Sequence, residues 1–331
     1  MKAVRYHGIR QVRCEEVPKP VPGPGEALIR VACAGICGSD LHIYNRGMFI
    51  QNIPEIMGHE FSGVVEAVES PDLPVQPGDL VVGNPMVPCG KCAGCRSGKY
   101  NTCSELGFIG EVRPGGFGQY IALPADRLVK AKPGTDPVAL ALAEPLAVAL
   151  NVCERMKPLP EERIAIIGAG PIGLLTLMVL KAVYGASHVT VVNRSEPRRH
   201  MAEALGADQI FGELPEDQLY DAVVEAAGKQ PSFEAAVAHT APGGRICMVS
   251  IFEDGFTVDL NAIVAGEIAL AGANAYEHRH IEEAVRLIEE GVLDVTPLIT
   301  GRYGLEQCAD AFEALCGKDR SAAKILFDPE K

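Results

Sequence analysis

Short apolar runs separated by turns make up the first part of the chain. Residues 27–33 and 61–68 are rich in Val, Ile and Ala, and Pro and Gly cluster at residues 22–25 and 76–79. Branched apolar residues suit extended backbone, whereas Pro and Gly mark turns. The pattern predicts a mostly β region of short strands.

The pattern changes near residue 140. Residues 137–156 space Ala and Leu as in a buried helix, and beyond them strands alternate with helices. The predicted strands are 163–167, 188–192, 221–225, 245–249 and 267–271, and the predicted helices are 173–184, 196–205 and one between residues 225 and 245. Such alternation specifies a parallel sheet with helices on both faces.

After about residue 274 the chain returns to isolated elements. Residues 280–290 and 307–315 are predicted helices, and residues 323–327 are a predicted final strand. A chain of 331 residues that is 47% hydrophobic can build two globular domains of ordinary size. We therefore expect two domains of different architecture.

Charge and hydropathy narrow the range of partners. The formal net charge is −13, and binding to nucleic acid or to an anionic membrane requires clustered Lys and Arg instead. The longest apolar run, residues 164–183, is interrupted by Gly and Pro, and the N-terminus lacks an apolar signal region. We therefore expect a cytoplasmic protein that binds neither nucleic acid nor membrane.

A glycine-rich turn follows the strand predicted at residues 163–167. Its sequence is Gly168, Ala169, Gly170, Pro171, Ile172 and Gly173. This G-x-G-x-x-G pattern between a strand and a helix predicts a dinucleotide site rather than a purely structural turn. Gly168 permits the tight turn, Gly170 lets the backbone approach the pyrophosphate, and Gly173 allows close packing of helix on strand.

The residues after the second predicted strand bear on the choice of dinucleotide. Asn193, Arg194 and Ser195 stand where an acidic residue normally holds the ribose 2′-hydroxyl, and Arg198 and Arg199 follow. Guanidinium groups without a carboxylate suit a 2′-phosphate, so the sequence favours NADP over NAD. In the alternative, the arginines form a solvated helix face and Asn193 binds an unphosphorylated ribose.

Four of the eleven cysteines are closely spaced. Cys89, Cys92, Cys95 and Cys103 form the pattern C-x2-C-x2-C-x7-C. Four thiolates can surround one Zn²⁺ tetrahedrally and leave no position for a substrate, which predicts a structural zinc site. An iron–sulfur cluster is the competing use of such cysteines.

A second group of possible ligands is dispersed along the chain. Cys37 lies within residues 35–42, His59 and Glu60 follow Gly58, and Glu144 precedes Pro145. Each alone has an ordinary explanation, such as a turn, a strand start or a helix cap. Together with the glycine turn and the cysteine group, these residues point to a metal site far more specifically than any one of them does alone.

The chain resembles the zinc-containing medium-chain alcohol dehydrogenases, close to the sorbitol and threonine dehydrogenase branch, over nearly its full length. The residues that carry the resemblance are 35–42, 58–60, 78–79, the four cysteines, 115–117, 144–145 and 168–173. The family's fold is α/β, with a GroES-like mostly-β catalytic domain and a Rossmann cofactor domain built on a doubly wound parallel sheet.

The resemblance also implies domain limits. The catalytic domain would comprise residues 1–148 and 274–331, with a structural-zinc lobe at residues 89–103, and residues 149–273 would form the cofactor domain, with the active site in the cleft between them. A homodimer or homotetramer is implied, joined through the strand at residues 267–271.

By the same resemblance, Cys37 and His59 ligate a catalytic zinc, and Glu60 or Glu144 completes the site, giving two Zn²⁺ per chain. Asp40 would orient His59. The zinc would lower the pKa of a substrate hydroxyl, and the carbinol hydride would pass to the nicotinamide.

Further roles follow from the family. Ser39 would take the proton and pass it through the ribose hydroxyls to His42. Residues 272–274, Asn274 among them, would approach the nicotinamide. Tyr44, Phe49 and Phe108 are candidates for lining the substrate pocket, although aromatic residues more often serve packing.

These features predict a zinc-dependent oxidoreductase that transfers a hydride between NAD(P) and a secondary alcohol such as a polyol or sugar acid. Within that class the runner-up is an L-threonine 3-dehydrogenase. A zinc-free quinone or enoyl reductase would lack both groups of metal ligands. A non-catalytic NADP-binding protein on the same fold is the third alternative.

Overall fold

A computed structural model describes residues 1–253, 255–317 and 321–331. Its contacts divide the chain into two compact units. Unit 1 contains Met1–Glu144 and most of the described chain from Glu277 onward, and unit 2 contains Pro145–Tyr276. Residues 321–323 belong to unit 2, although the sequence reading assigned them to the catalytic domain. The guanidinium of Arg198, on the helix at residues 196–204 of unit 2, donates a hydrogen bond to the Ala322 carbonyl (3.0 Å).

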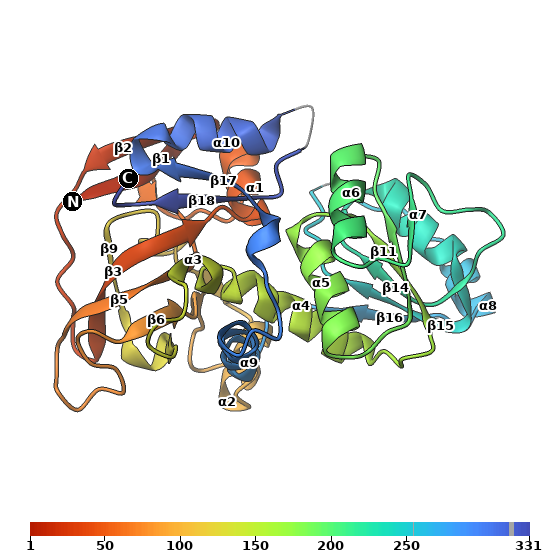
Figure 1. Cartoon of the computed structure of the whole chain (residues 1–331), viewed down its shortest axis with the longest axis horizontal. Helices are drawn as coiled ribbons and strands as arrows, with labels where there is room; N and C mark the ends of the chain where they lie inside the picture. The colour runs from red at the N-terminus through yellow and green to blue at the C-terminus, as the bar shows by residue number, and fades with distance from the viewer. Residues whose placement is uncertain (254, 318–320) are drawn as a thin grey trace. The chain divides into compact units, whose positions relative to one another are not determined.

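Unit 1 is built mainly of antiparallel strands (Figure 1). Its main sheet has the order β10-β6-β5-β3-β18-β17, with β9 also paired to β3, and only β17 and β18 in it run parallel. A second sheet has the order β2-β1-β4, and β7 pairs with β8. The strands are β1 (Lys2–Gly8), β2 (Gln11–Glu16), β3 (Glu26–Gly35), β4 (Glu55–Ile56), β5 (Glu60–Val68), β6 (Leu80–Gly83), β7 (Met86–Val87), β8 (Gly107–Phe108), β9 (Tyr120–Pro124), β10 (Leu128–Lys130), β17 (Ile299–Gly304) and β18 (Lys324–Asp328).

Helices surround this framework. They are α1 (Gly38–Arg46), α2 (Ala93–Arg96), α3 (Pro137–Leu140), α9 (His278–Glu289) and α10 (Cys308–Cys316). Edge-on aromatic packing joins α10 to the main sheet. The ring centroid of Phe117 lies 4.9 Å from that of Phe327 on β18 and 6.4 Å from that of Phe312 on α10. Among the described residues, none of the helices has the length and apolar character needed to cross a membrane.

Two glycine segments pack backbone against backbone beneath the ring of Phe117. Gly58 has φ +92°, and a Cβ there would lie 2.2 Å from that ring. A Cβ on Gly115 would lie 2.2 Å from the Gly58 carbonyl oxygen. Only glycine fits so close an approach, and the contact fixes the backbone that leads into His59.

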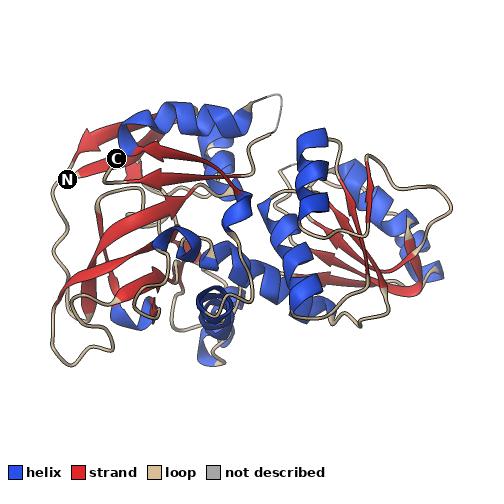
Figure 2. Cartoon of the chain, viewed as in Figure 1, coloured by secondary structure: helices blue, strands red, loops and turns tan. Residues whose placement is uncertain are grey.

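Unit 2 is a parallel sheet of order β13-β12-β11-β14-β15-β16 with helices on both faces (Figure 2). The strand order reverses beside β11, as in doubly wound dinucleotide-binding folds. The strands are β11 (Arg163–Ile167), β12 (His188–Val192), β13 (Gln209–Phe211), β14 (Tyr220–Glu225), β15 (Thr240–Met248) and β16 (Ala269–Gly272), and the helices are α4 (Ala143–Met156, which begins in unit 1), α5 (Pro171–Ala182), α6 (Glu196–Ala204), α7 (Gln230–Ala238) and α8 (Leu260–Ala265).

The alternating pattern of unit 2 is confirmed, with element ends shifted by a few residues. One prediction was wrong: residues 137–156 form two helices. The N–H of Leu142 bonds to the Ala139 carbonyl (3.0 Å), a tight i to i−3 turn that separates α3 from α4. Helix α5 starts at Pro171, where the missing N–H costs nothing.

Candidate metal and dinucleotide sites

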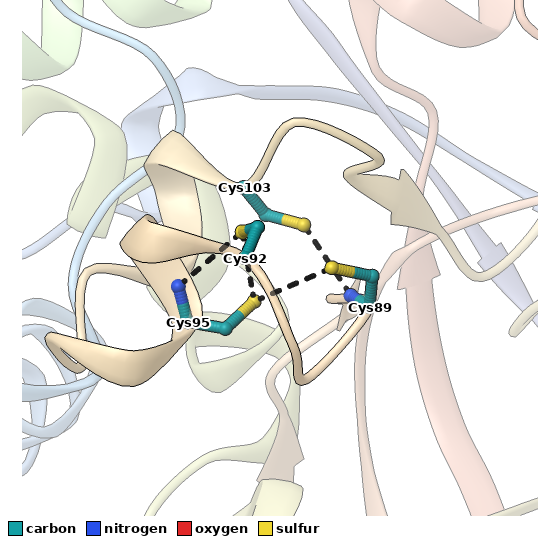
Figure 3. A group of neighbouring side chains, drawn as sticks. All are labelled: Cys89, Cys92, Cys95 and Cys103. Atoms are coloured by element: carbon teal, nitrogen blue, oxygen red, sulfur yellow. Dashed lines mark hydrogen bonds between the residues drawn. The ribbon is translucent and has the colours of Figure 1, made fainter.

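The four cysteines of the predicted structural site come together in unit 1. The backbone turns around α2 carry them, and all four sulfur atoms lie within 4.8 Å of one another (Figure 3). Cys95 Sγ lies 3.5 Å from Cys92 Sγ and 3.9 Å from Cys89 Sγ. A tetrahedral Zn²⁺ with Zn–S bonds of about 2.3 Å separates its sulfur ligands by roughly 3.8 Å. The group therefore fits one four-coordinate ion.

The thiols of this group differ in acidity. Backbone N–H donors lower the pKa of Cys89 and Cys92, whereas burial and neighbouring thiols raise the pKa of Cys95. Crowded thiolates repel one another, so one sulfur keeps its proton longest. A divalent cation at the centre would remove that repulsion, which is how structural zinc sites hold four thiolates.

A second group of possible ligands lies where β3, β5 and α1 meet. Cys37 precedes α1 as its N-cap, His59 immediately precedes β5, and Glu60 is the first residue of β5. Ligand atoms of these three residues lie within 4.8 Å of one another. Gly35 pairs with Glu60 across the sheet, and a Cβ on Gly35 would lie 2.3 Å from Glu60 Oε2. Glycine at this position therefore makes room for the carboxylate.

The surroundings of His59 are strongly anionic. Burial alone would lower its pKa, but the sulfur of Cys37, which also hydrogen-bonds the ring, and the carboxylates of Asp40 and Glu144 raise the pKa well above its ordinary value. Such an environment stabilises positive charge. A thiolate, an imidazole and a carboxylate are also the donors that Zn²⁺ prefers, so the residues fit the predicted ion.

Glu60 forms a buried ion pair that the sequence reading missed. Lys324 Nζ donates to both carboxylate oxygens, at 2.8 and 2.7 Å, and to the Ile36 carbonyl at 3.1 Å. The side chains of Lys324 and Glu60 are 1% and 0% exposed. A lysine inside the apolar strand 323–327 was a usable signal, since a buried lysine requires a partner.

Glu144 is buried near the same site. It is 4% exposed, in the first turn of α4, and its charge raises the pKa values of His59 and Lys324. Of the described residues, only Cys37, His59 and Glu60 form the compact ligand group here, and Glu144 lies outside it.

Asp40, Ser39 and His42 follow Cys37 on α1. The carboxylate of Asp40 accepts a hydrogen bond from the backbone N–H of Cys37 (2.8 Å), and its charge raises the pKa of His59. Ser39 and His42, both half-buried, are spaced i, i+3 and so share one side of the helix.

The three proposed pocket aromatics have different environments. Phe108 lies beside the metal-ligand group, with its ring 6.0 Å from that of His59. Tyr44 is buried in core packing instead: its ring lies 4.8 Å from that of Phe312 and its hydroxyl donates to Glu313 (2.7 Å). Phe49 is 45% exposed. The assignment of Tyr44 to the pocket was wrong, because α10 packs against it.

The glycine turn of unit 2 has the geometry that its sequence predicts. Gly168 has φ +114°, and a Cβ on Gly173 would lie 1.9 Å from the Gly168 carbonyl oxygen. Gly170 is the N-cap of α5, with open space where a Cβ would stand. Pro171 and Ile172 open the helix. The turn therefore leaves a helix N-terminus open to a phosphate.

The residues after β12 are held mainly by one another. Asn193 Oδ1 accepts a hydrogen bond from the Ser195 N–H (2.8 Å), and Arg199 donates to the carbonyls of Asn193 and Arg194 (both 2.9 Å). Arg194 is 77% exposed and lies 3.6 Å from the exposed Glu213. Arg198 binds the Ala322 carbonyl. Of the three arginines in this segment, Arg194 is thus the one that the described residues hold least.

The loop after β16 carries the last predicted cofactor residue. Asn274 is exposed, and its carbonyl accepts a hydrogen bond from the Asn151 side chain (3.4 Å). The Ala275 carbonyl accepts from the same amide at 2.8 Å. Asn151 on α4 therefore fixes the backbone of this loop.

Two family models match the chain. Residues 23–133 match the alcohol dehydrogenase GroES-like domain, and residues 171–290 match the zinc-binding dehydrogenase domain. The chain is 30% identical to a sorbitol dehydrogenase of Bacillus subtilis, covering 100% of this chain and 98% of that protein. It is 33% identical to an L-threonine 3-dehydrogenase of Pyrococcus horikoshii, covering 94% and 93%.

Solved structures are similar over 99% of the chain. An alcohol dehydrogenase from Escherichia coli CFT073 in complex with NADH has a TM-score of 0.92 at 28% identity and is covered over 99% of its length. A zinc-binding dehydrogenase from Sinorhizobium meliloti bound to NADP has a TM-score of 0.91 at 28% identity, with 99% coverage. Galactitol-1-phosphate dehydrogenase from Escherichia coli has a TM-score of 0.92 at 28% identity, with 100% coverage.

Matches of this length define the class of protein, a zinc-dependent oxidoreductase that transfers a hydride between an alcohol and a nicotinamide dinucleotide. The chain belongs to the zinc-binding alcohol dehydrogenase family. The predicted fold, a GroES-like domain with a Rossmann domain, is confirmed.

Proposed function

We propose that Cys37, His59 and Glu60 hold the catalytic zinc of an enzyme that oxidises polyols or similar secondary alcohols. The observation that carries this proposal is the compact group of their ligand atoms, within 4.8 Å of one another. Glu144, the alternative carboxylate ligand, adds negative charge close by. The four-cysteine group is proposed to hold the second, structural zinc, since its sulfur spacing suits one ion better than a multi-iron cluster.

A bound Zn²⁺ supplies Lewis acidity, which lowers the pKa of an alcohol hydroxyl. The protein's part is to keep the donors in place: Asp40 holds the Cys37 backbone, and Lys324 holds the Glu60 carboxylate. Ser39 accepts the hydroxyl proton, and His42, on the same side of α1, passes it toward solvent. The glycine turn binds the dinucleotide that takes the hydride.

For the dinucleotide, we propose NADP rather than NAD. Arg194 is exposed after β12, and the region lacks the usual acid, so a 2′-phosphate would meet a guanidinium rather than a carboxylate. Asn193, Arg198 and Asn274 are proposed to complete the binding surface. One similar structure binds NADH and another binds NADP. The proposal of NADP therefore depends on the residues that follow β12.

We further propose that the protein is a homo-oligomer of the cytoplasm. Val264 on α8 is 75% exposed and Leu270 on the edge strand β16 is 41% exposed, which supports a homodimer or homotetramer joined at this edge. All eleven cysteines are free thiols, which suits the reducing cytoplasm. Within the proposed class, an L-threonine 3-dehydrogenase is the second candidate, supported by relatives of that name.

One experiment tests the proposal. Purified protein is analysed for zinc and screened against polyols, sugar acids and threonine with each dinucleotide. We expect two zinc ions per chain and turnover of a secondary alcohol. In the Cys37→Ser variant, turnover and one zinc should be lost, while dinucleotide affinity should stay nearly unchanged. A fully active Cys37→Ser enzyme would contradict the proposed metal site.

A further inference from the structure

Glu111 lies in a tight loop beside the proposed catalytic zinc site. Its N–H donates to the Phe108 carbonyl (3.1 Å), and its own carbonyl accepts from the Gln51 N–H (3.0 Å). In the same loop, Gly110 has φ +82°, and a Cβ there would lie 2.7 Å from the backbone nitrogen of Gly58. The loop is therefore pinned against the residue that precedes His59.

The side chain of Glu111 is largely buried, but its carboxylate oxygens keep some contact with solvent. It is 8% exposed, and among the described residues no hydrogen bond or ion pair reaches its carboxylate. Two other buried acids of unit 1 have close partners: Glu60 accepts from Lys324, and Glu55 accepts from the Ile56 N–H (3.0 Å). The carboxylate is therefore open to a hydrogen-bond donor from water or from a ligand.

The carboxylate shares the surroundings of the metal ligands. Burial raises the pKa of Glu111, while the charge of His59 lowers it and that of Asp40 raises it. The ring of Phe108, at the start of the same loop, lies 6.0 Å from that of His59. The loop that carries Phe108 and Glu111 therefore lies beside His59, and the charges of Glu111 and His59 interact.

Charge at this site selects among substrates. Asp40, Glu60 and Glu144 already surround His59 or its neighbours, and Lys324 is paired with Glu60. Glu111 adds a further carboxylate, so the surroundings stay negative even with a divalent cation and Lys324 present. Phosphate or carboxylate groups on a substrate would be repelled, whereas hydroxyl and ammonium groups would be attracted.

We propose that Glu111 is a specificity-determining residue whose carboxylate accepts a hydrogen bond from a hydroxyl or ammonium group next to the carbinol carbon of the substrate. This inference rests on the proposed metal site. It narrows the substrate class to vicinal diols, polyols and amino alcohols and disfavours alcohols whose only charged group is a phosphate or a carboxylate.

The test uses the zinc-loaded, full-length enzyme and four compounds of similar size: 2-butanol, 2,3-butanediol, 3-amino-2-butanol and 3-hydroxybutanoate. The kcat/KM for each is measured in the wild type, in Glu111→Gln and in the control Glu55→Gln. Zinc content and melting temperature are recorded for all three proteins, so that loss of the metal or of folding is seen directly.

We expect the wild type to prefer the diol or the amino alcohol to 2-butanol, and to use 3-hydroxybutanoate poorly. Glu111→Gln should lower kcat/KM for the preferred compound by roughly tenfold or more, as for loss of a charge-assisted hydrogen bond. Its zinc content and its kcat/KM for 2-butanol should be close to wild type. If kcat/KM falls more for 2,3-butanediol, the group that donates to Glu111 is a hydroxyl. If it falls more for 3-amino-2-butanol, the donor is an ammonium group. Glu55→Gln should change none of these ratios.

Three results would overturn the inference while leaving the proposed function intact. One is a wild type that prefers 3-hydroxybutanoate. The second is a Glu111→Gln enzyme whose substrate ratios are unchanged. The third is an equal loss on all four compounds, which indicates a structural role. By contrast, a zinc-loaded wild type that oxidises none of the compounds contradicts the proposed function itself.

Discussion

Among single residues, Lys324 has the largest expected effect on the proposed catalytic zinc site. It is buried with Glu60, and its ammonium also holds the Ile36 carbonyl, one residue before Cys37. Removing one partner of a buried ion pair leaves an uncompensated charge and costs about 3–5 kcal/mol. The pair thus links the ends of β3, β5 and β18 to the position of two proposed ligands.

We therefore expect Lys324→Met to lower the free energy of unfolding by about 3 kcal/mol or more and to weaken zinc binding. Denaturant unfolding and zinc titration measure the two effects. Lys331→Met, at an exposed position, is the matched control and should behave like the wild type. A Lys324→Met protein as stable as the control would contradict this role.

The second prediction for a single residue concerns Arg194 and the choice of dinucleotide. Because its guanidinium is exposed and its ion pair with Glu213 is long (3.6 Å), it is available to a 2′-phosphate at little cost. Arg194→Ala should reduce the preference for NADP over NAD by roughly tenfold, measured as the ratio of kcat/KM values. The control is Arg279→Ala, on unit 1. An unchanged ratio would refute NADP selection by Arg194.

The sequence identified residues whose local motifs are distinctive and missed those defined by tertiary contacts. Cys37, His59 and the four clustered cysteines were found because they lie in short sequence motifs that are typical of metal ligands. Lys324 and Glu111 were missed because their importance depends on residues far along the chain: Glu60 is 264 positions from Lys324. Tyr44 was misassigned because only the fold shows that α10 covers it.

At the level of elements, Arg245 joins three segments of unit 2. Its guanidinium donates to the carbonyls of Met156 (2.5 Å) and Lys157 (3.1 Å) at the end of α4, and to both carboxylate oxygens of Glu162, just before β11 (2.9 and 2.5 Å). The pair is about four-fifths buried, so it is screened less than a surface pair.

The hydrogen bonds from Arg245 lower the pKa of Glu162 below its usual 4.5. A lowered folded-state pKa contributes stability above the unfolded value, and this stability is lost as pH falls through the folded value. Glu162→Gln should therefore cost about 1–3 kcal/mol at pH 7. The difference from wild type should shrink from near pH 5 downward. Denaturant unfolding between pH 7 and 3 measures it, and a difference independent of pH would be evidence against the ion pair.

Unit 2 was easier to predict than unit 1. Strands β11, β12, β14 and β15 of its parallel sheet are each followed by a helix, so local pattern and order along the chain specify the layers. In unit 1, β3 pairs with β5, β9 and β18, and these partners come from distant segments. Short strands such as β7 and β8 have too few residues to show a period. Their register depends on tertiary packing rather than on sequence pattern.

For the whole molecule, the two units divide the chemistry. Both groups of metal ligands belong to unit 1, and the glycine turn belongs to unit 2. Metal binding and dinucleotide binding can therefore be disturbed separately. Metal binding also contributes to folding, because the unfolded chain offers no preformed site.

Cys92→Ser tests this division. The variant should contain one zinc per chain instead of two and should melt at a lower temperature, because the lobe loses the ion that its thiolates would surround. Its dinucleotide affinity should equal that of the wild type, since the glycine turn is built by other residues. Zinc analysis, calorimetry and fluorescence titration with NADPH measure the three quantities. Cys316→Ser, outside both ligand groups, should keep two zinc ions. Unchanged zinc in Cys92→Ser, or dinucleotide affinity lost together with the metal, would show that the lobe does not hold a separate structural ion.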